Sequence, residues 1–229
     1  MTCTPDDRAI TGGPDIAATI RLSPSLTSRR IEFAHAVESA HGMIASFAVD
    51  HEWAAYMRVF FDRGIEIFVR QADLWARIRE LYALPGATPL PTPGLAAALE
   101  WGILLAVTPE EYMRVAPEYG SSPEAYQRLL AHEVAHRLHV SILGGDEDAM
   151  GPLWFYEGFA VVASGDLTDP PRGNHTWEAL IAPGPQAYRR YGALLRRLME
   201  RIPLSDLVDR ARAHDFEQWA RSVFLREQK

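Results

Sequence analysis

The sequence predicts an α+β fold, in which a small mixed β-sheet packs on one long helix and the C-terminal part is mostly helical. Two short apolar segments, 65–69 and 101–108, have the composition of strands. The segment 123–143 has the length and the end signals of a long helix, and further helical patterns follow it.

The N-terminal part is expected to begin with a tail and continue with helices. Residues 1–27 contain scattered Pro, Gly, Ser and Thr without a sustained period, which predicts a tail or loosely attached arm. From Ser28 the apolar residues recur with helical spacing, and Asp50 is expected to cap a second helix that ends near Phe61. Residues 28–229 are then predicted to form a single domain.

The middle of the chain is expected to supply the sheet. Ile65–Val69 alternates and is β-branched, and a helix is predicted over residues 72–82. The four prolines of residues 84–94 predict a loop, because each removes a backbone donor. The apolar run 101–108 is predicted to be the second strand.

The rest of the chain is expected to be helical, with one long loop. The helix 123–143 is predicted to start after Ser122 and to stop at Gly144–Gly145. Residues 28–143 would thus contain the sheet and this helix, and residues 153–229 a helical subdomain. The segments that follow are a helix over 153–163, a loop over 165–185 that contains His175 and Trp177, and helices over 186–201 and 204–224.

Composition excludes several classes of partner. The 229 residues include 30 acidic and 23 Lys or Arg residues, a net charge of -7, which argues against a nucleic-acid or anionic-membrane binder. Cys3 is the single cysteine, so no intramolecular disulfide is expected. The absence of a long apolar run and of a signal-like start leads us to expect a cytoplasmic protein without a membrane span.

The most informative motif is the run 132–136, His-Glu-Val-Ala-His, which matches the pattern H-E-x-x-H. On a helix, His132 and His136 lie one turn apart on the same face and can hold one Zn²⁺. Glu133 stands beside the first histidine, where it can reach a water bound to the metal. The competing interpretation is a chance match on an amphipathic helix that binds no metal.

A catalytic zinc site needs a third protein ligand. His139 lies about 10.5 Å of helix rise beyond His132, so one straight helix cannot bring all three histidines to one ion. The metzincin spacing is absent, because His139 and Ile142 stand where its Gly and third His are found. The acid Glu157, separated from His136 by twenty residues and flanked by aromatic residues, is the better candidate.

With Glu157 in its segment Trp154–Ala160, the chain resembles the gluzincins, zinc peptidases that include aminopeptidase N and small zincin-like peptidase domains. The resemblance covers about residues 95–200. It implies a zincin-like fold, Zn²⁺ bound by His132, His136 and Glu157, and Glu133 as the general base.

The resemblance also points to an oxyanion donor and leaves other roles open. The register of Tyr188 with Leu198 favours Tyr188 as the donor, with Tyr191 and His139 as alternatives. The segment 97–102 resembles the aminopeptidase segment whose Glu holds the substrate amine, here Glu100, although the Asn of that segment is missing. Endopeptidase and aminopeptidase specificity therefore both stay open.

One position departs from the gluzincin pattern. Val161 stands where many gluzincins have an acid that orients a zinc-bound histidine, and Asp146, Asp166 or a backbone carbonyl can take its place. The expected function is zinc-dependent hydrolysis of peptide bonds in a peptide or protein substrate. The alternative is a zinc-binding regulatory or interaction domain of the same fold with little turnover.

Overall fold

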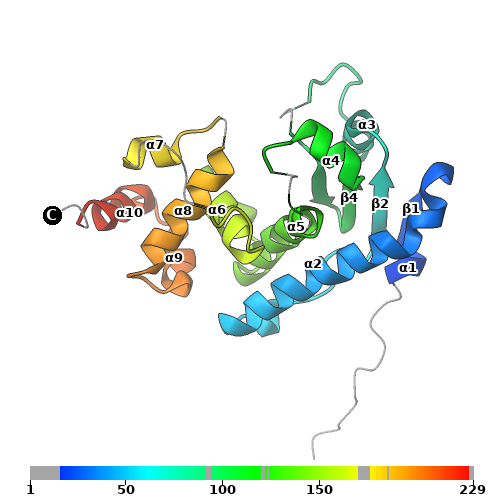
Figure 1. The fold of residues 1–229 in the computed structure, drawn as a ribbon. Coiled ribbons are helices and arrows are strands. Elements are labelled where there is room, and N and C mark those ends of the chain that lie inside the picture. Colours follow the sequence, from blue (N-terminus) through cyan, green and yellow to red (C-terminus); the bar gives the residue numbers. More distant parts are fainter. Residues whose placement is uncertain are drawn as a thin grey trace, which may run out of the picture.

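The computed structural model describes residues 16–90, 94–119, 122, 124–169, 176–184 and 186–226. In these ranges the chain forms an α+β fold, in which helices outnumber the strands of one four-stranded mixed sheet (Figure 1). No helix in these ranges combines the length and the hydropathy needed to cross a membrane.

The sheet has the strand order β1-β2-β4-β3. Its strands are β1 (Ile20–Leu22), β2 (Gly64–Phe68), β3 (Ala97–Glu100) and β4 (Ile103–Val107). β1, β2 and β4 run parallel, whereas β3 pairs antiparallel with β4 and forms an edge of this sheet. β4 is buried along its whole length, as expected for a strand covered on both faces.

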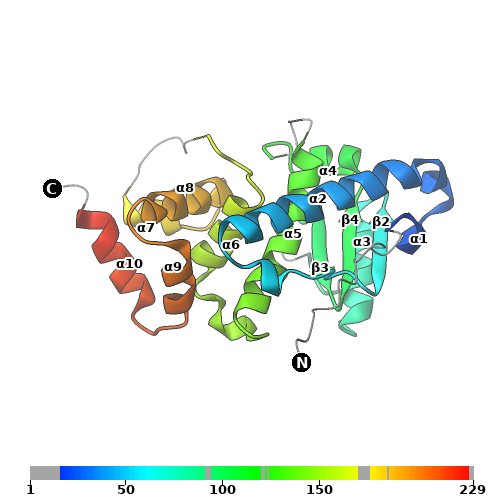
Figure 2. The same ribbon diagram turned by 90° about the horizontal axis from the view of Figure 1, so that it is seen from below.

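Helices surround the sheet and extend away from it as a separate group at the C-terminal end (Figure 2). On the sheet side are α1 (Ile16–Thr19), α2 (Arg30–Asp50), α3 (Gln71–Leu81), α4 (Pro109–Val115) and α5 (Ala125–Ile142). The C-terminal group consists of α6 (Leu153–Ala163), α7 (Trp177–Ile181), α8 (Ala187–Met199), α9 (Leu204–Ala211) and α10 (Phe216–Leu225).

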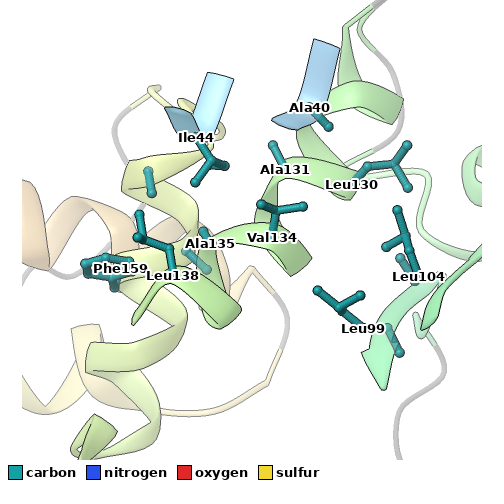
Figure 3. Close-up of a cluster of buried hydrophobic side chains, with 14 of the residues drawn as sticks. Ala40, Ile44, Leu99, Leu104, Leu130, Ala131, Val134, Ala135, Leu138 and Phe159 are labelled. Atoms are coloured by element: carbon teal, nitrogen blue, oxygen red, sulfur yellow. The ribbon is translucent and has the colours of Figure 1, made fainter. Parts of the chain in front are cut away.

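Helix α5 lies at the centre of the core. Its apolar side chains Leu130, Ala131, Val134, Ala135 and Leu138 are fully buried. Figure 3 shows them between Ala40 and Ile44 of α2, Leu99 and Leu104 of the sheet, and Phe159 of α6. Because α5 contacts the sheet edge on one side and α6 on the other, its orientation is determined by neighbours from both halves of the chain.

Two glycines bring α8 unusually close to α6. A Cβ atom on Gly158 would lie 2.9 Å from the backbone oxygen of Tyr191, and one on Gly192 would lie 2.5 Å from Cγ1 of Val161. At Gly158 the contact is with backbone, so a side chain there requires movement of a helix; at Gly192 a side chain would displace Val161.

The predicted strand over 65–69 and the helices over 72–82, 123–143, 153–163 and 186–201 are confirmed to within a few residues. Gly144 and Gly145 end α5 with φ angles of 71° and 94°, the left-handed conformation expected after a helix. The expectation that Ser122 is the N-cap of this helix is wrong: the helix begins at Ala125, and its N-cap is Glu124, which makes no side-chain capping hydrogen bond.

Two N-terminal predictions are wrong. Residues 16–29 are not a tail, because Ile20 and Leu26 are buried and β1 pairs with β2; residues 1–15 lie outside the described ranges. Asp50 does not cap a second helix, because the buried stripe of α2 continues through Ile44 and Ala48 and the helix runs on to Asp50.

Three later segments also differ from the prediction. Trp101 and Gly102 form a turn with φ angles of 53° and 74°, so the strand begins only at Ile103. The predicted loop 165–185 contains α7, with Trp177 buried against Trp154, whereas His175 lies outside the described residues. The predicted helix 204–224 is broken into α9 and α10, which lets Phe216 stack on Trp154 with ring centroids 5.7 Å apart.

Candidate metal centre

Helix α5 presents His132 and His136 on the face that meets α6. Their side chains are 15% and 21% exposed, whereas the neighbouring apolar residues of the helix are fully buried in the core. The rings meet edge to face, with centroids 4.7 Å apart. Because residues four apart lie on the same face of a helix, both imidazoles point to the same place.

Helix α6 brings the third group to the same point. Oε2 of Glu157 lies 3.0 Å from Nε2 of His132 and 3.5 Å from Nε2 of His136, and the two Nε2 atoms are 3.1 Å apart. The Glu157 side chain is 13% exposed. Within the described residues, these three form the group whose ligand atoms converge closely enough to hold a metal ion.

The donor triangle has the size of a zinc site. Two ligands at about 2.0–2.1 Å from a tetrahedral Zn²⁺ are about 3.3 Å apart, and the three distances here bracket that value. Two imidazoles and one carboxylate also match the donor set of catalytic zinc sites that retain one open position. His132, His136 and Glu157 thus fit the ion in both chemistry and spacing.

The electrostatics of this group are those of a tightly coupled cluster. Burial alone would raise the pKa of Glu157, but hydrogen bonds with His132 and His136 hold it at about 2. Burial opposes the charged form of His132, yet the hydrogen bond to Glu157 raises its pKa. Glu157 is therefore a carboxylate, ready to act as a ligand.

Glu133 adjoins the cluster and has a different environment. Burial raises its pKa above the ordinary value, the two histidines lower it, and the charges of Glu157 and Glu100 raise it further. A carboxylate whose proton affinity is increased in this way is a stronger base, which suits it to accept a proton from water.

Tyrosines surround the two histidines. The ring of Tyr188, on α8, meets His132 edge to face at 5.6 Å, and Tyr156 meets His136 at 5.8 Å. Tyr119 in turn contacts Tyr188 at 5.8 Å. Tyr156 and Tyr119 were not among the predicted site residues; Tyr156 adjoins Glu157 in sequence, but no sequence signal identifies Tyr119, which approaches only through tertiary packing.

The surroundings of Tyr188 differ from those of Tyr191 and His139, the two alternative candidates for the oxyanion donor. Tyr191 is 1% exposed, and His139 is fully buried. His139 stacks on Phe159 with ring centroids 4.3 Å apart, in the core. Of these three residues, Tyr188 has the ring contact with His132.

Among the residues that the structure describes, no acid forms a hydrogen bond with Nδ1 of His136 in place of the one absent at Val161. Val161 is 1% exposed and faces α8 at Gly192, and Nδ1 of His136 is buried without a hydrogen-bond partner in the described ranges. Asp146 caps the short turn that follows α5 by accepting a hydrogen bond from the Asp148 amide. Asp166 accepts one from the Leu167 amide, and its charge contributes to the raised pKa of His132.

Glu100 lies at the end of edge strand β3. It accepts a hydrogen bond from the hydroxyl of Tyr82, and its charge is one of those that raise the pKa of Glu133. β3 also packs on α5, the helix that carries the candidate ligands His132 and His136.

Comparison with known protein families, with curated protein sequences and with solved structures finds no match for this chain.

Proposed function

We propose that the protein is a zinc-dependent peptide hydrolase of the gluzincin type with a zincin-like fold. The observation that carries this proposal is the triangle of His132, His136 and Glu157 donor atoms, with 3.0, 3.1 and 3.5 Å edges, together with the half-buried carboxylate of Glu133 on the same helix. A structural site would have no use for a base next to an incompletely filled coordination sphere.

Zn²⁺ bound by these three residues would polarise the scissile carbonyl and lower the pKa of a water molecule. Glu133 removes the proton from the attacking water and then delivers it to the nitrogen of the leaving amine. The hydroxyl of Tyr188 donates a hydrogen bond to the oxygen that becomes negatively charged in the transition state.

The sheet edge supports an extended peptide as substrate. β3 pairs with β4 on one side only in the described part of the chain, an arrangement that an added extended segment can complete. Ala97, Ala98 and Leu99 are buried, and Glu100 is the more exposed end of the strand. Since β3 packs against α5, a peptide added there would run past the metal-ligand group.

A second candidate is a zinc-binding regulatory domain with little turnover. The observation that favours it is the unpartnered Nδ1 of His136 together with Val161, because an oriented histidine usually increases metal affinity by about 10- to 100-fold. The intact Glu133 favours the enzyme over this alternative.

The test uses Glu133→Gln, which keeps the size of the side chain but cannot accept a proton. Zinc content is measured on untagged protein, and hydrolysis is followed on a library of internally quenched peptides. We expect about one zinc per chain in parent and variant, and hydrolysis by the parent alone. Zinc without hydrolysis in the parent would favour the regulatory domain, and absence of zinc after incubation with the ion would exclude both.

A further inference from the structure

An exposed aromatic pair stands where β3 turns into β4. Trp101 is 58% exposed and Tyr82 is 45% exposed, and their ring centroids are 5.9 Å apart. Trp101 also has a left-handed φ of 53° at the first position of a two-residue turn, where Asn, Asp or Gly is favoured. A bulky residue that is both strained and exposed costs stability, which indicates a role outside folding.

The turn is held in place by the segment that precedes β2. The backbone amide of Arg63 donates a hydrogen bond to the backbone oxygen of Gly102 at 2.9 Å. The guanidinium of Arg63 donates one to the backbone oxygen of Trp101 at 3.3 Å. A Cβ atom on Gly102 would lie 2.7 Å from Oδ1 of Asp62. The backbone that carries the indole is therefore held by hydrogen bonds and close packing, which reduces the conformational freedom lost on binding.

A carboxylate without a cationic partner lies beside this pair. The Tyr82 hydroxyl donates a hydrogen bond to Glu100, and no Lys, Arg or His of the described ranges forms an ion pair with Glu100. Arg137, whose charge lowers the pKa of Tyr82, is already paired with Glu147 at 2.6 Å. The Glu100 carboxylate therefore has no ion-pair partner in the described ranges, while the guanidinium of Arg63 is bonded to the backbone oxygen of Trp101.

The corner formed by Trp101, Tyr82 and Glu100 is linked to the candidate metal centre through the packing of β3 on α5. Glu100 is the last residue of β3, the strand that packs on α5, and its charge acts on Glu133. Arg137 directly follows the ligand His136 in α5. A group bound against Trp101 and Tyr82 can therefore belong to the same peptide that reaches Glu133.

We propose that Trp101, Tyr82 and Glu100 form a subsite for a basic side chain of the peptide substrate, with arginine preferred. A guanidinium stacks on aromatic faces through cation–π attraction and also pairs with a carboxylate in a planar, two-point geometry. This inference rests on the proposed function and adds a substrate preference to it.

The experiment compares arginine with citrulline, which has the same length and shape but no charge. Internally quenched peptides, blocked at both ends, carry one or the other at each position in turn, and kcat/KM is measured with the zinc-loaded protein. At one position we expect arginine to be favoured by about tenfold. In Trp101→Asn, whose new side chain suits the turn, and in Glu100→Gln, this ratio should fall towards one.

A matched control removes another exposed aromatic ring. Tyr56 is 42% exposed and donates no side-chain hydrogen bond that is seen in the described ranges, so Tyr56→Ala should leave the arginine-to-citrulline ratio unchanged. A ratio of one in the parent, or a preference that survives Trp101→Asn, would overturn the subsite while peptide hydrolysis stands. In a second peptide set with a free N-terminus, faster cleavage than of the blocked peptides without any arginine preference would identify the terminal ammonium as the cation and would also overturn the subsite.

If no peptide is hydrolysed, the proposed function fails and the subsite is judged by binding. Calorimetry with the same peptide pairs then gives the arginine-to-citrulline affinity ratio for the parent and for Trp101→Asn. A ratio near ten that is lost in the variant supports the subsite, and equal affinities overturn it.

Discussion

Helix α5 carries His132 and His136 on a face that meets Glu157, and His139, one turn farther on, on a face that meets Phe159. The same residue type has opposite properties in the two places. The hydrogen bond to Glu157 raises the pKa of His132 against the effect of burial, whereas burial lowers the pKa of His139 to about 3. The neighbour contributed by α6 decides whether a histidine of α5 is a ligand candidate or a core residue.

Helix α8 shows the same division with tyrosines. Tyr188 contacts His132, and Tyr191, about one turn later, is buried with its hydroxyl unpartnered in the described ranges. Both helices thus have one face at the candidate metal centre, which we call the chemical face, and one face in the core, which we call the packing face. Substitutions on the chemical face should change zinc binding or turnover, and substitutions on the packing face should change stability.

The largest effect is expected from the acid that defines the chemical face. Glu157→Ala leaves two imidazoles to bind the ion, so zinc affinity should fall by orders of magnitude. A competition titration with a zinc chelator measures this, with circular dichroism as a check that the helices persist. Undiminished affinity would mean that the third ligand is another residue.

The two tyrosines of α8 should differ in their effect on turnover. Tyr188→Phe should lower kcat by about 100- to 1000-fold with little change in KM, since the lost hydrogen bond forms only as charge develops. Tyr191→Phe removes a buried hydroxyl that has no partner in the described ranges and should leave kcat unchanged. Equal losses in both variants would contradict the division of α8 into two faces.

The core histidine should respond to acid in a way that its apolar replacement does not. The pKa of His139 is lowered from 6.5 to about 3 by burial, so the unfolded chain binds more protons between these values. The free energy of unfolding is therefore independent of this group above about pH 6.5. As the pH falls below that value, the free energy of unfolding decreases by about 1.4 kcal/mol per pH unit.

Urea unfolding of the parent and of His139→Leu between pH 7 and 5 measures this loss. The variant should have the flatter profile. The comparison stops at pH 5 because the pKa of Glu111, held at about 2 mainly by its hydrogen bonds with Arg114, adds a loss of stability below about pH 4.5 in both proteins. Parallel profiles above pH 5 would show that His139 does not remain neutral in the fold.

The smallest effect is expected on stability at neutral pH. Both ring nitrogens of His139 are buried without a partner in the described ranges, and a buried donor in that state costs about 1–3 kcal/mol. His139→Leu should therefore raise the free energy of unfolding by about 1 kcal/mol and leave zinc binding unchanged. His132→Ala is the matched opposite, with zinc lost and the helical signal kept.

Local patterns in the sequence were sufficient for the main helices and for the candidate ligand group. The apolar period and the glycine stop of α5, the limits of α6 and the alternation in β2 are properties of adjacent residues, which a sequence records directly. The ligand group was also within reach, because the spacing of His132 and His136 on one helix turn is local, and Glu157 stands out as an acid among aromatic residues.

Only the tertiary structure decided which faces those helices present and what covers them. Strand β1 exists because it pairs with β2, more than forty residues away, as the register of Ile20 with Ile65 shows. Asp50 could cap a helix, but the buried stripe of α2 extends it instead. The placing of His139 in the core and of Tyr188 at the metal-ligand group depends on contacts of α5 and α8 with α6. Such contacts join residues far apart in the chain, so a local pattern contains no record of them.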